Sequence, residues 1–311
     1  MSVRIVFMGN PAIANPILKA LNESFYEIVG VVSNAPKLMG RGQMLKHTAI
    51  GELSNELNLN YIPAVSLKDD EFHSKLISLK PDIFVVVAFR ILPNSVLGIP
   101  KMGSINLHTS LLPKYRGAAP IQHALLNGDS ETGITTFSIE QRVDAGEILM
   151  QEKIKIEKQD DFGSLSEKMA KKGIDLVLNT LNQLENNSVK PIQQDKDLAS
   201  SAPKITKEMC AINWNNPVEK IKNQVRAFSP FPGAFTTMNG KRLKIYKSLI
   251  LDNKNWDYGG KISLLEKNRM AVSCGDGLLE LLEIQFEGKR RMTMGDCLKG
   301  LNVNIGDTIG T

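Results

Sequence analysis

The sequence of 311 residues contains only three cysteines, and no two of them form a CxxC pair. An odd and scattered set argues against a disulfide framework and against a zinc site. We therefore expect Cys210, Cys274 and Cys297 to be reduced, packed thiols in a cytoplasmic protein that binds no metal.

Long apolar runs are missing as well, and we expect no signal peptide. No stretch reaches the roughly eighteen apolar residues of a membrane span. Met1 leads directly into the strand-like segment VRIVFMG, without the regions of a signal peptide. We expect neither secretion nor a membrane partner. The composition, 42% hydrophobic and 23% charged, is that of an ordinary globular protein, and the length suggests two domains.

Two nucleotide-binding motifs are also absent. The segment Gly9-Asn10-Pro11 lacks the glycine spacing GxGxxG, and it places a proline where a phosphate-binding helix would begin. No GxxxxGK segment is present either. A dinucleotide cofactor is therefore disfavoured, and phosphoryl transfer has no support from the sequence.

Charge is divided unevenly along the chain. Residues 1–200 hold 21 basic and 22 acidic side chains, whereas residues 201–311 hold 17 basic and 11 acidic ones. A basic region beside a neutral one suggests a polyanionic partner, because phosphate neutralisation dominates affinity for nucleic acids. A surface charge that merely favours solubility is the alternative.

The N-terminal part alternates short apolar runs with helical patterns, which predicts an α/β fold with a doubly wound, Rossmann-like parallel sheet. The apolar runs predict strands at 3–8, 28–32 and 83–88. The helical patterns lie at 15–23, 48–57 and 70–79. Further along we expect a strand at 104–108, a short helix near 121–126, a strand at 134–139, and a helix that opens with a capping box formed by Ser164 and Glu167.

Residues 190–203 lose this periodicity and gain proline, serine and charge, which indicates an extended linker. A helical stretch at 217–227 follows, and then short alternating segments bounded by Gly and Asn turns, at 243–246, 261–265 and 270–273. This pattern is typical of a small, OB-like antiparallel β-barrel. We expect a first domain at 1–189, a linker at 190–204 and a basic β-barrel domain at 205–311.

The most informative segment is Ser104 to Pro113. Strand alternation places Asn106 and His108 on the same side at the carboxyl end of a strand, where open α/β sheets bind their ligands. The amide can donate a hydrogen bond to a developing oxyanion, and the imidazole can take a proton near neutral pH. A strand-end histidine bonded only to its surroundings is the alternative.

Two loops could complete this site. Residues 114–120 supply small residues and a proline, so their backbone can approach a ligand closely. Asp144 lies in a loop that ends in Gly146, and its carboxylate could orient His108 and stabilise its charge. A simple Asx-turn residue is the alternative for Asp144.

Together with SLLPKYRGAAPIQ at 110–122, Asn106, His108 and Asp144 resemble the active site of the formyltransferases that use 10-formyltetrahydrofolate. Among these, the rest of the chain is similar to the methionyl-tRNA formyltransferases. The similar segments lie at 202–208, 212–214, 225–228, 230–234, 274–277 and 285–289.

The resemblance implies transfer of a formyl group from 10-formyltetrahydrofolate, a co-substrate rather than a tightly bound cofactor, to the α-amino group of methionyl initiator tRNA. Asn106 is then expected to donate to the oxyanion of a tetrahedral intermediate, and His108 to relay the amine proton towards N10 of the folate. Asp144 is expected to hold the tautomer of His108 and to favour its charged form. The alternative is another formyltransferase or a formyl-folate hydrolase that acts on a small molecule.

The resemblance also implies the substrate contacts, in a chain that we expect to be a monomer. The folate is expected beside Phe89, Arg90, Ile91, Ser110, Leu111, Leu112 and Pro113. Residues 88–93 depart from the family pattern, with Phe89 for Tyr, Arg90 for Gly and one residue fewer. We expect tRNA contacts from basic residues of the glycine-containing loop at 37–46, where Arg41 matches a GRG motif, and of the C-terminal part. They are Arg41, Lys46, Lys204, Lys207, Arg226, Lys289, Arg290 and Arg291. By itself, the loop could equally be a solvated surface loop.

Overall fold

The structure, a computed structural model, describes residues 2–39, 43–252 and 259–310. The chain divides into two compact units that do not follow one another simply along the sequence. The first unit contains Met1–Gly117, Glu131–Lys155 and Ser166–Ala202, and the second contains Ala118–Ser130, Ile156–Leu165 and Pro203–Thr311.

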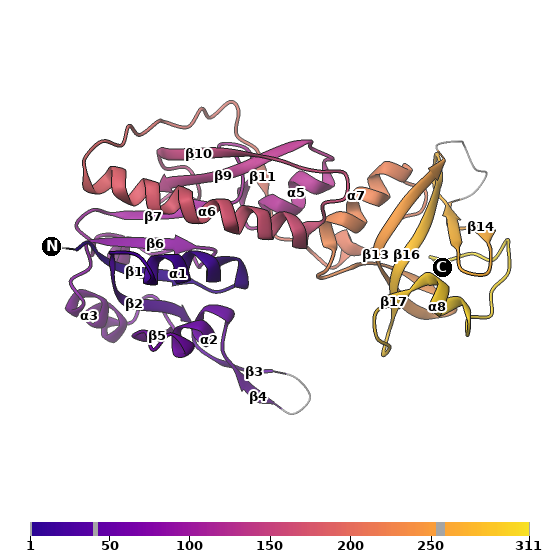
Figure 1. The fold of residues 1–311 in the computed structure, drawn as a ribbon, viewed down its shortest axis with the longest axis horizontal. Coiled ribbons are helices and arrows are strands. Elements are labelled where there is room, and N and C mark those ends of the chain that lie inside the picture. The colour runs from indigo at the N-terminus through magenta and orange to yellow at the C-terminus, as the bar shows by residue number, and fades with distance from the viewer. Residues whose placement is uncertain (1, 40–42, 253–258, 311) are drawn as a thin grey trace. The chain divides into compact units, whose positions relative to one another are not determined.

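A seven-stranded sheet forms the first unit, in the order β10-β9-β7-β6-β1-β2-β5 (Figure 1). Its strands are β1 (Arg4–Gly9), β2 (Glu27–Asn34), β5 (Tyr61–Ala64), β6 (Ile83–Val87), β7 (Ser104–His108), β9 (Glu131–Ser138) and β10 (Ile148–Lys155). The five strands from β7 to β5 are parallel, whereas β9 and β10 pair in antiparallel fashion. The mostly parallel sheet confirms the fold class that the apolar runs predict.

Helices connect the parallel strands, and a long helix follows β10. They are α1 (Asn15–Asn22) after the short η1 (Ala12–Ala14), α2 (Ala49–Glu56), α3 (Asp70–Ser78), α4 (Asn94–Leu97) and α6 (Phe162–Glu185). Helix α6 lies against β7 and β9, because a Cβ at Gly173 would meet the Leu107 side chain and Thr180 is hydrogen-bonded to Thr136 at 2.7 Å. Two small pairs complete the unit, β3 (Lys37–Met39) with β4 (Met44–Lys46), and β8 (Arg116–Gly117) with β11 (Ser201–Ala202).

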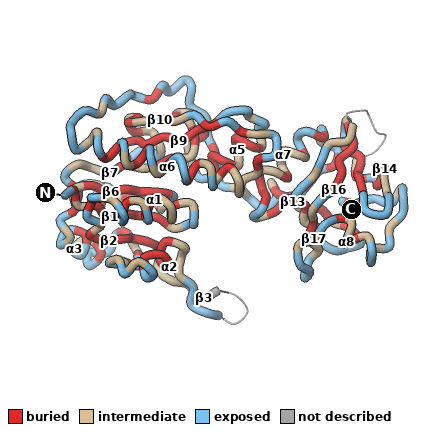
Figure 2. The backbone as a smooth tube through the Cα atoms, viewed as in Figure 1, coloured by how far each residue is buried: buried red, intermediate tan, exposed pale blue. Residues whose placement is uncertain are grey.

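The central strands β1, β6 and β7 are almost entirely buried, whereas the edge strands β5 and β10 are buried only in part (Figure 2). Every residue of β6 is buried, as its uninterrupted apolar sequence predicts for a central parallel strand. Phe84, Val86, Val6 and Val32 belong to one apolar cluster beside this sheet. Burial of this kind contributes about 25 cal/mol per Å² of apolar surface, and it fixes the positions at which the strands end.

An antiparallel sheet dominates the second unit, in the order β12-β13-β16-β15-β14, with β17 also pairing with β16. These strands are β12 (Ala234–Met238), β13 (Lys241–Asp252), β14 (Ile262–Leu265), β15 (Met270–Ser273), β16 (Leu278–Phe286) and β17 (Met292–Thr293). The helices of the unit are α5 (Pro120–Leu126), η2 (Glu208–Cys210), α7 (Val218–Phe228) and α8 (Met294–Leu298). The small antiparallel β domain confirms the second half of the predicted fold class.

Two local predictions are wrong. Helix α6 begins two residues before the predicted cap, because Asp161 is a competing acceptor: its Oδ1 accepts from the Ser164 amide at 2.9 Å, and Ser164 Oγ accepts from the Asp161 amide at 3.1 Å. The predicted series also omits both edge strands of the sheet: β10, and the four-residue β5, which contains Pro63. Proline weakens a strand signal and is tolerated at sheet edges.

The segment predicted as an extended linker forms no helix, but it is attached to the first unit. Ile192 exchanges two backbone hydrogen bonds with Ile148, and β11 pairs in parallel with β8. In the part of the chain that the structure describes, no helix is long and apolar enough to cross a membrane.

Candidate active site

The carboxyl edge of the parallel sheet gathers the candidate residues. In the pairing of β6 with β7, Val87 is opposite Leu107, so the two strands end side by side. The loop that starts at Ala88 and the loop that starts at Thr109 therefore leave the sheet at the same edge. Open α/β sheets bind their ligands at this edge, which makes it the candidate active site.

Asn106 and His108 lie two residues apart on β7, and so on the same face of the sheet. The Asn106 Oδ1 atom is buried and has no hydrogen-bond partner among the described residues. This oxygen is an acceptor, so it is available to a donor group of a ligand, because buried polar atoms otherwise find partners. The structure thus places the predicted amide and imidazole together.

The tautomer of His108 follows from its partner. Nε2 of the ring lies 2.9 Å from the carbonyl oxygen of Tyr115. A carbonyl oxygen can only accept, so Nε2 must carry the proton, and in the neutral ring Nδ1 has the lone pair. The Tyr115 carbonyl therefore sets this tautomer, and the predicted orienting role of Asp144 stays a prediction.

Asp144 faces the other ring nitrogen. Its Oδ2 atom lies 3.8 Å from His108 Nδ1, too far for a hydrogen bond but close enough for strong electrostatic interaction in a buried site. The same oxygen accepts a hydrogen bond from the Gly117 amide at 2.8 Å. Asp144 has a left-handed backbone, with φ of 50°. The Asp144 carboxylate therefore bonds to the turn at residues 114–120. Its hydrogen bond is not confined to its own loop, as it would be in a simple Asx turn.

Two effects oppose each other at His108, which is 5% exposed. Burial lowers the pKa of His108 below its usual 6.5, because the charged ring loses its hydration, while the Asp144 carboxylate and the Tyr115 carbonyl raise it in part. Because burial has the larger effect, the ring is neutral at neutral pH. It can therefore accept a proton on Nδ1, and the nearby carboxylate stabilises the resulting cation.

Residues 110–113, predicted to lie beside a folate, are held by the neighbouring strands. Thr135 on β9 donates to the Ser110 carbonyl at 2.7 Å and accepts from the Leu112 amide at 3.2 Å. Gln151 on β10 donates to the Leu112 carbonyl at 2.8 Å. Because these backbone groups already have partners, this loop offers a ligand mainly shape and apolar contact.

The predicted folate residues 89–91 differ in their surroundings. Phe89 packs against the apolar cluster of the sheet, whereas Ile91 is 73% exposed. The Arg90 guanidinium lies 5.4 Å from the centre of the Phe89 ring and donates to the carbonyls of Ala64 and Val65. Arg90 therefore ties this loop to the end of β5.

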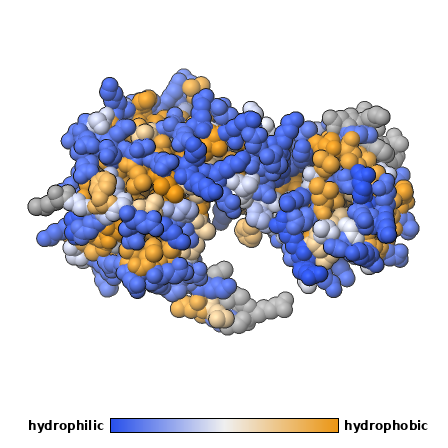
Figure 3. All heavy atoms as spheres, viewed as in Figure 1, coloured by the Kyte–Doolittle hydropathy of each residue, from blue (hydrophilic) through white to orange (hydrophobic). Residues whose placement is uncertain are grey.

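The two ends of the glycine-containing loop at 37–46 pair as the antiparallel strands β3 and β4, and the predicted tRNA contact Arg41 lies outside the described residues. Lys46 is exposed on β4. Leu38, Met44 and Leu45 are also exposed, and Figure 3 shows apolar side chains on the outside of this hairpin. Exposed apolar residues beside basic ones fit a surface that contacts a partner.

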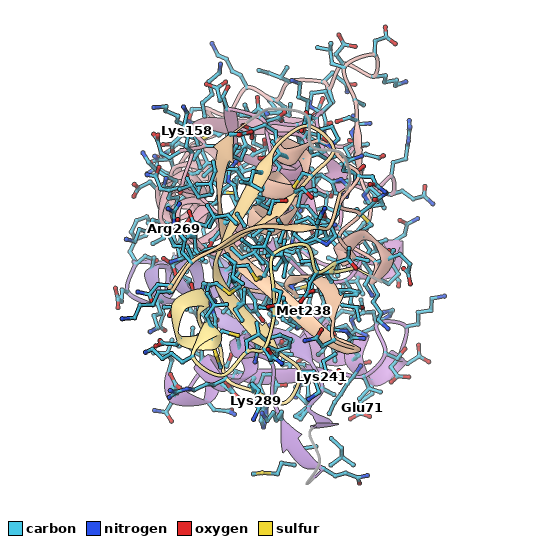
Figure 4. The ribbon with its side chains drawn as sticks, turned by 90° about the vertical axis from the view of Figure 1, so that its right-hand side faces the viewer. Glu71, Lys158, Met238, Lys241, Arg269 and Lys289 are labelled. Carbon is cyan, nitrogen blue, oxygen red and sulfur yellow. The ribbon has the colours of Figure 1, made fainter. Side chains whose placement is uncertain are left out.

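In the second unit, four exposed basic residues gather at one end of the β13–β16 pair. Lys289 and Arg290 were predicted, and Lys241 and Arg242 join them because Leu243 is opposite Phe286 in the sheet. Figure 4 labels Lys241 and Lys289, which lie near each other in that view. Lys241 and Arg242 were not among the predicted contacts, although the Asn239-Gly240 turn before them signals the hairpin. Lys204 and Lys207 are exposed as well.

Two other predicted cations already have partners. The Arg226 guanidinium donates to the carbonyls of Asp160 at 2.6 Å and Glu157 at 3.0 Å. Arg291 pairs with Glu283 at 2.6 Å and stacks over Tyr246. These contacts hold both side chains within their own unit, so they are less available to phosphates than Lys241, Lys289 and Arg290; Arg242 itself lies over the Phe235 ring, 5.0 Å from its centre.

Comparison with known proteins places this geometry in a family. The profile of the formyl transferase family matches residues 3–181, and that of the formyl transferase C-terminal domain matches residues 204–302. The methionyl-tRNA formyltransferase of Caldanaerobacter subterraneus subsp. tengcongensis is 40% identical over 306 residues, which are 98% of this chain and 99% of the relative. The methionyl-tRNA formyltransferase of Flavobacterium johnsoniae is 37% identical over 304 residues, 96% of each chain.

A solved structure shares the fold. The N-formyltransferase from Helicobacter canadensis superposes with a TM-score of 0.67 at 20% identity, over 93% of this chain and 100% of that one. From the close relatives and the two profiles together, the chain belongs to the methionyl-tRNA formyltransferase family.

Proposed function

We propose that this protein transfers the formyl group of 10-formyltetrahydrofolate to the α-amino group of methionyl initiator tRNA, which gives N-formylmethionyl-tRNA for translation initiation. The relatives that match almost the whole chain bear the name of this activity. The observation that carries the proposal is that Asn106 and His108 lie together at the end of β7, with the Asp144 carboxylate 3.8 Å from Nδ1 of His108.

The folate supplies the formyl group and, at N10, the leaving nitrogen. The methionyl amine forms the new bond to the formyl carbon and loses a proton, which His108 accepts on Nδ1. The amide of Asn106 donates to the oxygen that gains negative charge at that carbon. The bond from carbon to N10 then breaks, and the proton passes from His108 to N10.

The partners of the His108 ring suit both its neutral and its cationic state. In the cationic state, Nε2 still donates to the Tyr115 carbonyl, and the new Nδ1 proton faces Asp144 Oδ2. Asp144 therefore acts by its charge while the proton is on the ring. Its second contact, with the Gly117 amide, keeps the carboxylate in place throughout.

The substrates are proposed to bind different parts of the chain. The folate lies against the loops at 89–91 and 110–113, where apolar surface dominates. The tRNA phosphates bind the basic residues, chiefly Lys46, Lys204, Lys207, Lys289 and Arg290, with Lys241 and Arg242 added. On this view residues 1–189 are the catalytic domain, 190–204 the linker and 205–311 the tRNA-binding domain, in a monomer that works in the cytoplasm.

The test is single-turnover formylation of charged initiator tRNA with 10-formyltetrahydrofolate labelled in its formyl group. The proposal expects label on the methionyl amine from the wild-type chain, and a rate lower by at least about a hundredfold from His108→Ala. Samples without tRNA are the control. Label released as formate whether or not tRNA is present would instead show a formyl-folate hydrolase, and would reject the proposed acceptor.

A further inference from the structure

The segment between the two matched family regions takes part in the architecture of the active site. Ser200 accepts a hydrogen bond on Oγ from the Tyr115 amide at 2.9 Å, and its carbonyl accepts from the Arg116 amide at 2.8 Å. Tyr115 is the residue whose carbonyl binds His108. One end of this segment is thus bonded to the residue that sets the tautomer of His108.

Gln194 makes the second connection, and it is the one buried residue in the otherwise exposed stretch 191–200. Its Nε2 donates to the carbonyls of Asp144 at 3.0 Å and Gly146 at 2.7 Å. Its Oε1 accepts from Arg116, through Nε at 3.0 Å and through a terminal nitrogen at 2.6 Å. The amide therefore uses both of its donor hydrogens and both acceptor positions.

These four bonds connect the two segments that flank the Asp144 carboxylate. On one side, Arg116 precedes Gly117, whose amide binds Asp144 Oδ2. On the other, Asp144 holds a left-handed backbone, and a Cβ at Gly146 would clash with the Ser138 carbonyl oxygen. A backbone segment in such a constrained conformation needs hydrogen-bond partners that hold it there. Gln194 is such a partner, because it binds the carbonyls of Asp144 and Gly146, on both sides of Ala145.

We propose that Gln194 is a positioning residue for the formyl transfer: by binding Arg116, Asp144 and Gly146 at once, it keeps the Asp144 carboxylate facing Nδ1 of His108. The role rests on the proposed function for its effect on turnover, but the placement of the carboxylate can be measured without any reaction. Gln194 reaches the reacting atoms only through Asp144.

The variant Gln194→Met tests this role, because methionine has a similar length and fills the same space without making hydrogen bonds. Gln193→Met is the matched control, since Gln193 is the exposed neighbour and donates only to Glu147. We expect Gln194→Met to lower the single-turnover rate by about tenfold to a hundredfold, as small displacements of catalytic groups do, and the KM for methionyl-tRNA to stay within twofold. Gln193→Met should match the wild-type chain.

The second measurement separates positioning from mere stability. The chain has four histidines, so the His108 signal can be assigned in NMR spectra by comparison with His108→Asn. Asp144 is the charged group recorded beside the ring among the described residues, and its charge raises the pKa of His108. Displacing that carboxylate in Gln194→Met should move the His108 titration to lower pH, whereas a purely structural role would lower the unfolding temperature alone.

Each outcome decides the matter. A wild-type rate together with an unmoved His108 titration in folded Gln194→Met would overturn the proposal. If that variant does not fold, Gln194→Glu replaces it, because its carboxylate still accepts from Arg116 but cannot donate to the two carbonyls; an unchanged rate would again overturn the role. A wild-type chain that fails to formylate tRNA would reject the proposed function, while the His108 titrations would still test the placement of Asp144.

Discussion

His108 and Tyr115 are joined by a hydrogen bond of 2.9 Å from the ring Nε2 to the backbone carbonyl, and Tyr115 has a left-handed backbone with φ of 60°. Asp144, on the other side of the ring, is also left-handed. Such a conformation costs a residue other than glycine about 1–2 kcal/mol. Both neighbours of the imidazole therefore hold unfavourable backbone conformations, which the hydrogen bonds of Ser200 and Gln194 help to maintain.

The first prediction concerns the titration of His108. Burial lowers the pKa of this ring, so its NMR titration should have a midpoint below 6.5, with the neutral form dominant above it. Asp144→Asn removes the charge that raises the pKa, so the midpoint should move lower still. A midpoint above 6.5 in the wild-type chain would show that burial does not outweigh the charge of Asp144. An upward shift in Asp144→Asn would show that Asp144 does not raise the pKa of His108.

The second prediction concerns Asn106. Replacing an oxyanion donor costs on the order of 3 kcal/mol in the barrier, so Asn106→Ala should reduce the single-turnover rate about a hundredfold or more. Folate binding in equilibrium dialysis should change little, because the donor acts on the transition state. Asn94→Ala, at an exposed asparagine of α4, is the control. Turnover of Asn106→Ala near that of the control would remove this residue from the mechanism.

Much of the fold could be predicted because it depends on local patterns. A continuous apolar run located β6 to within one residue, the strand expected at 104–108 coincides with β7, and alternation along β7 placed Asn106 beside His108. The edge strand β5 was missed, since Pro63 and a length of four residues leave little local signal. For α6, the apolar spacing was visible, but the choice between Asp161 and Ser164 as the cap depends on detailed geometry.

The interactions around the site are harder to predict from sequence because they join distant residues. Gln194 bonds to Asp144 and to Arg116, which precede it by 50 and 78 residues. Its own segment has no periodicity, so nothing local distinguishes it from exposed Gln193. The contact of the Tyr115 carbonyl with His108 could not be predicted either, because every residue has a backbone carbonyl and no sequence motif distinguishes this one. Only the fold shows that a segment predicted as a linker is hydrogen-bonded to Asp144.

The third prediction assigns Arg226 mainly to stability. Its guanidinium donates to the carbonyls of Asp160 and Glu157, and Arg226→Met would leave both without this partner. We expect the free energy of unfolding in urea to fall by about 1–3 kcal/mol. Lys220→Met, at an exposed position of the same helix, should change it little. An unchanged stability combined with a large loss of tRNA affinity would instead make Arg226 a direct phosphate contact.

The last prediction concerns the basic residues at the end of the β13–β16 pair. If Lys289 and Arg290 bind tRNA phosphates, Lys289→Ser and Arg290→Ser should each weaken tRNA binding and reduce the slope of log affinity against log salt by about one. Folate affinity should stay the same and depend little on salt, because its proposed contacts are largely apolar. Lys299→Ser is the matched control, since Lys299 already pairs with Asp296 at 2.7 Å. If all three variants keep the wild-type slope of log affinity against log salt, the phosphate contacts lie elsewhere. If all three lose tRNA affinity equally, only the net charge of the chain matters.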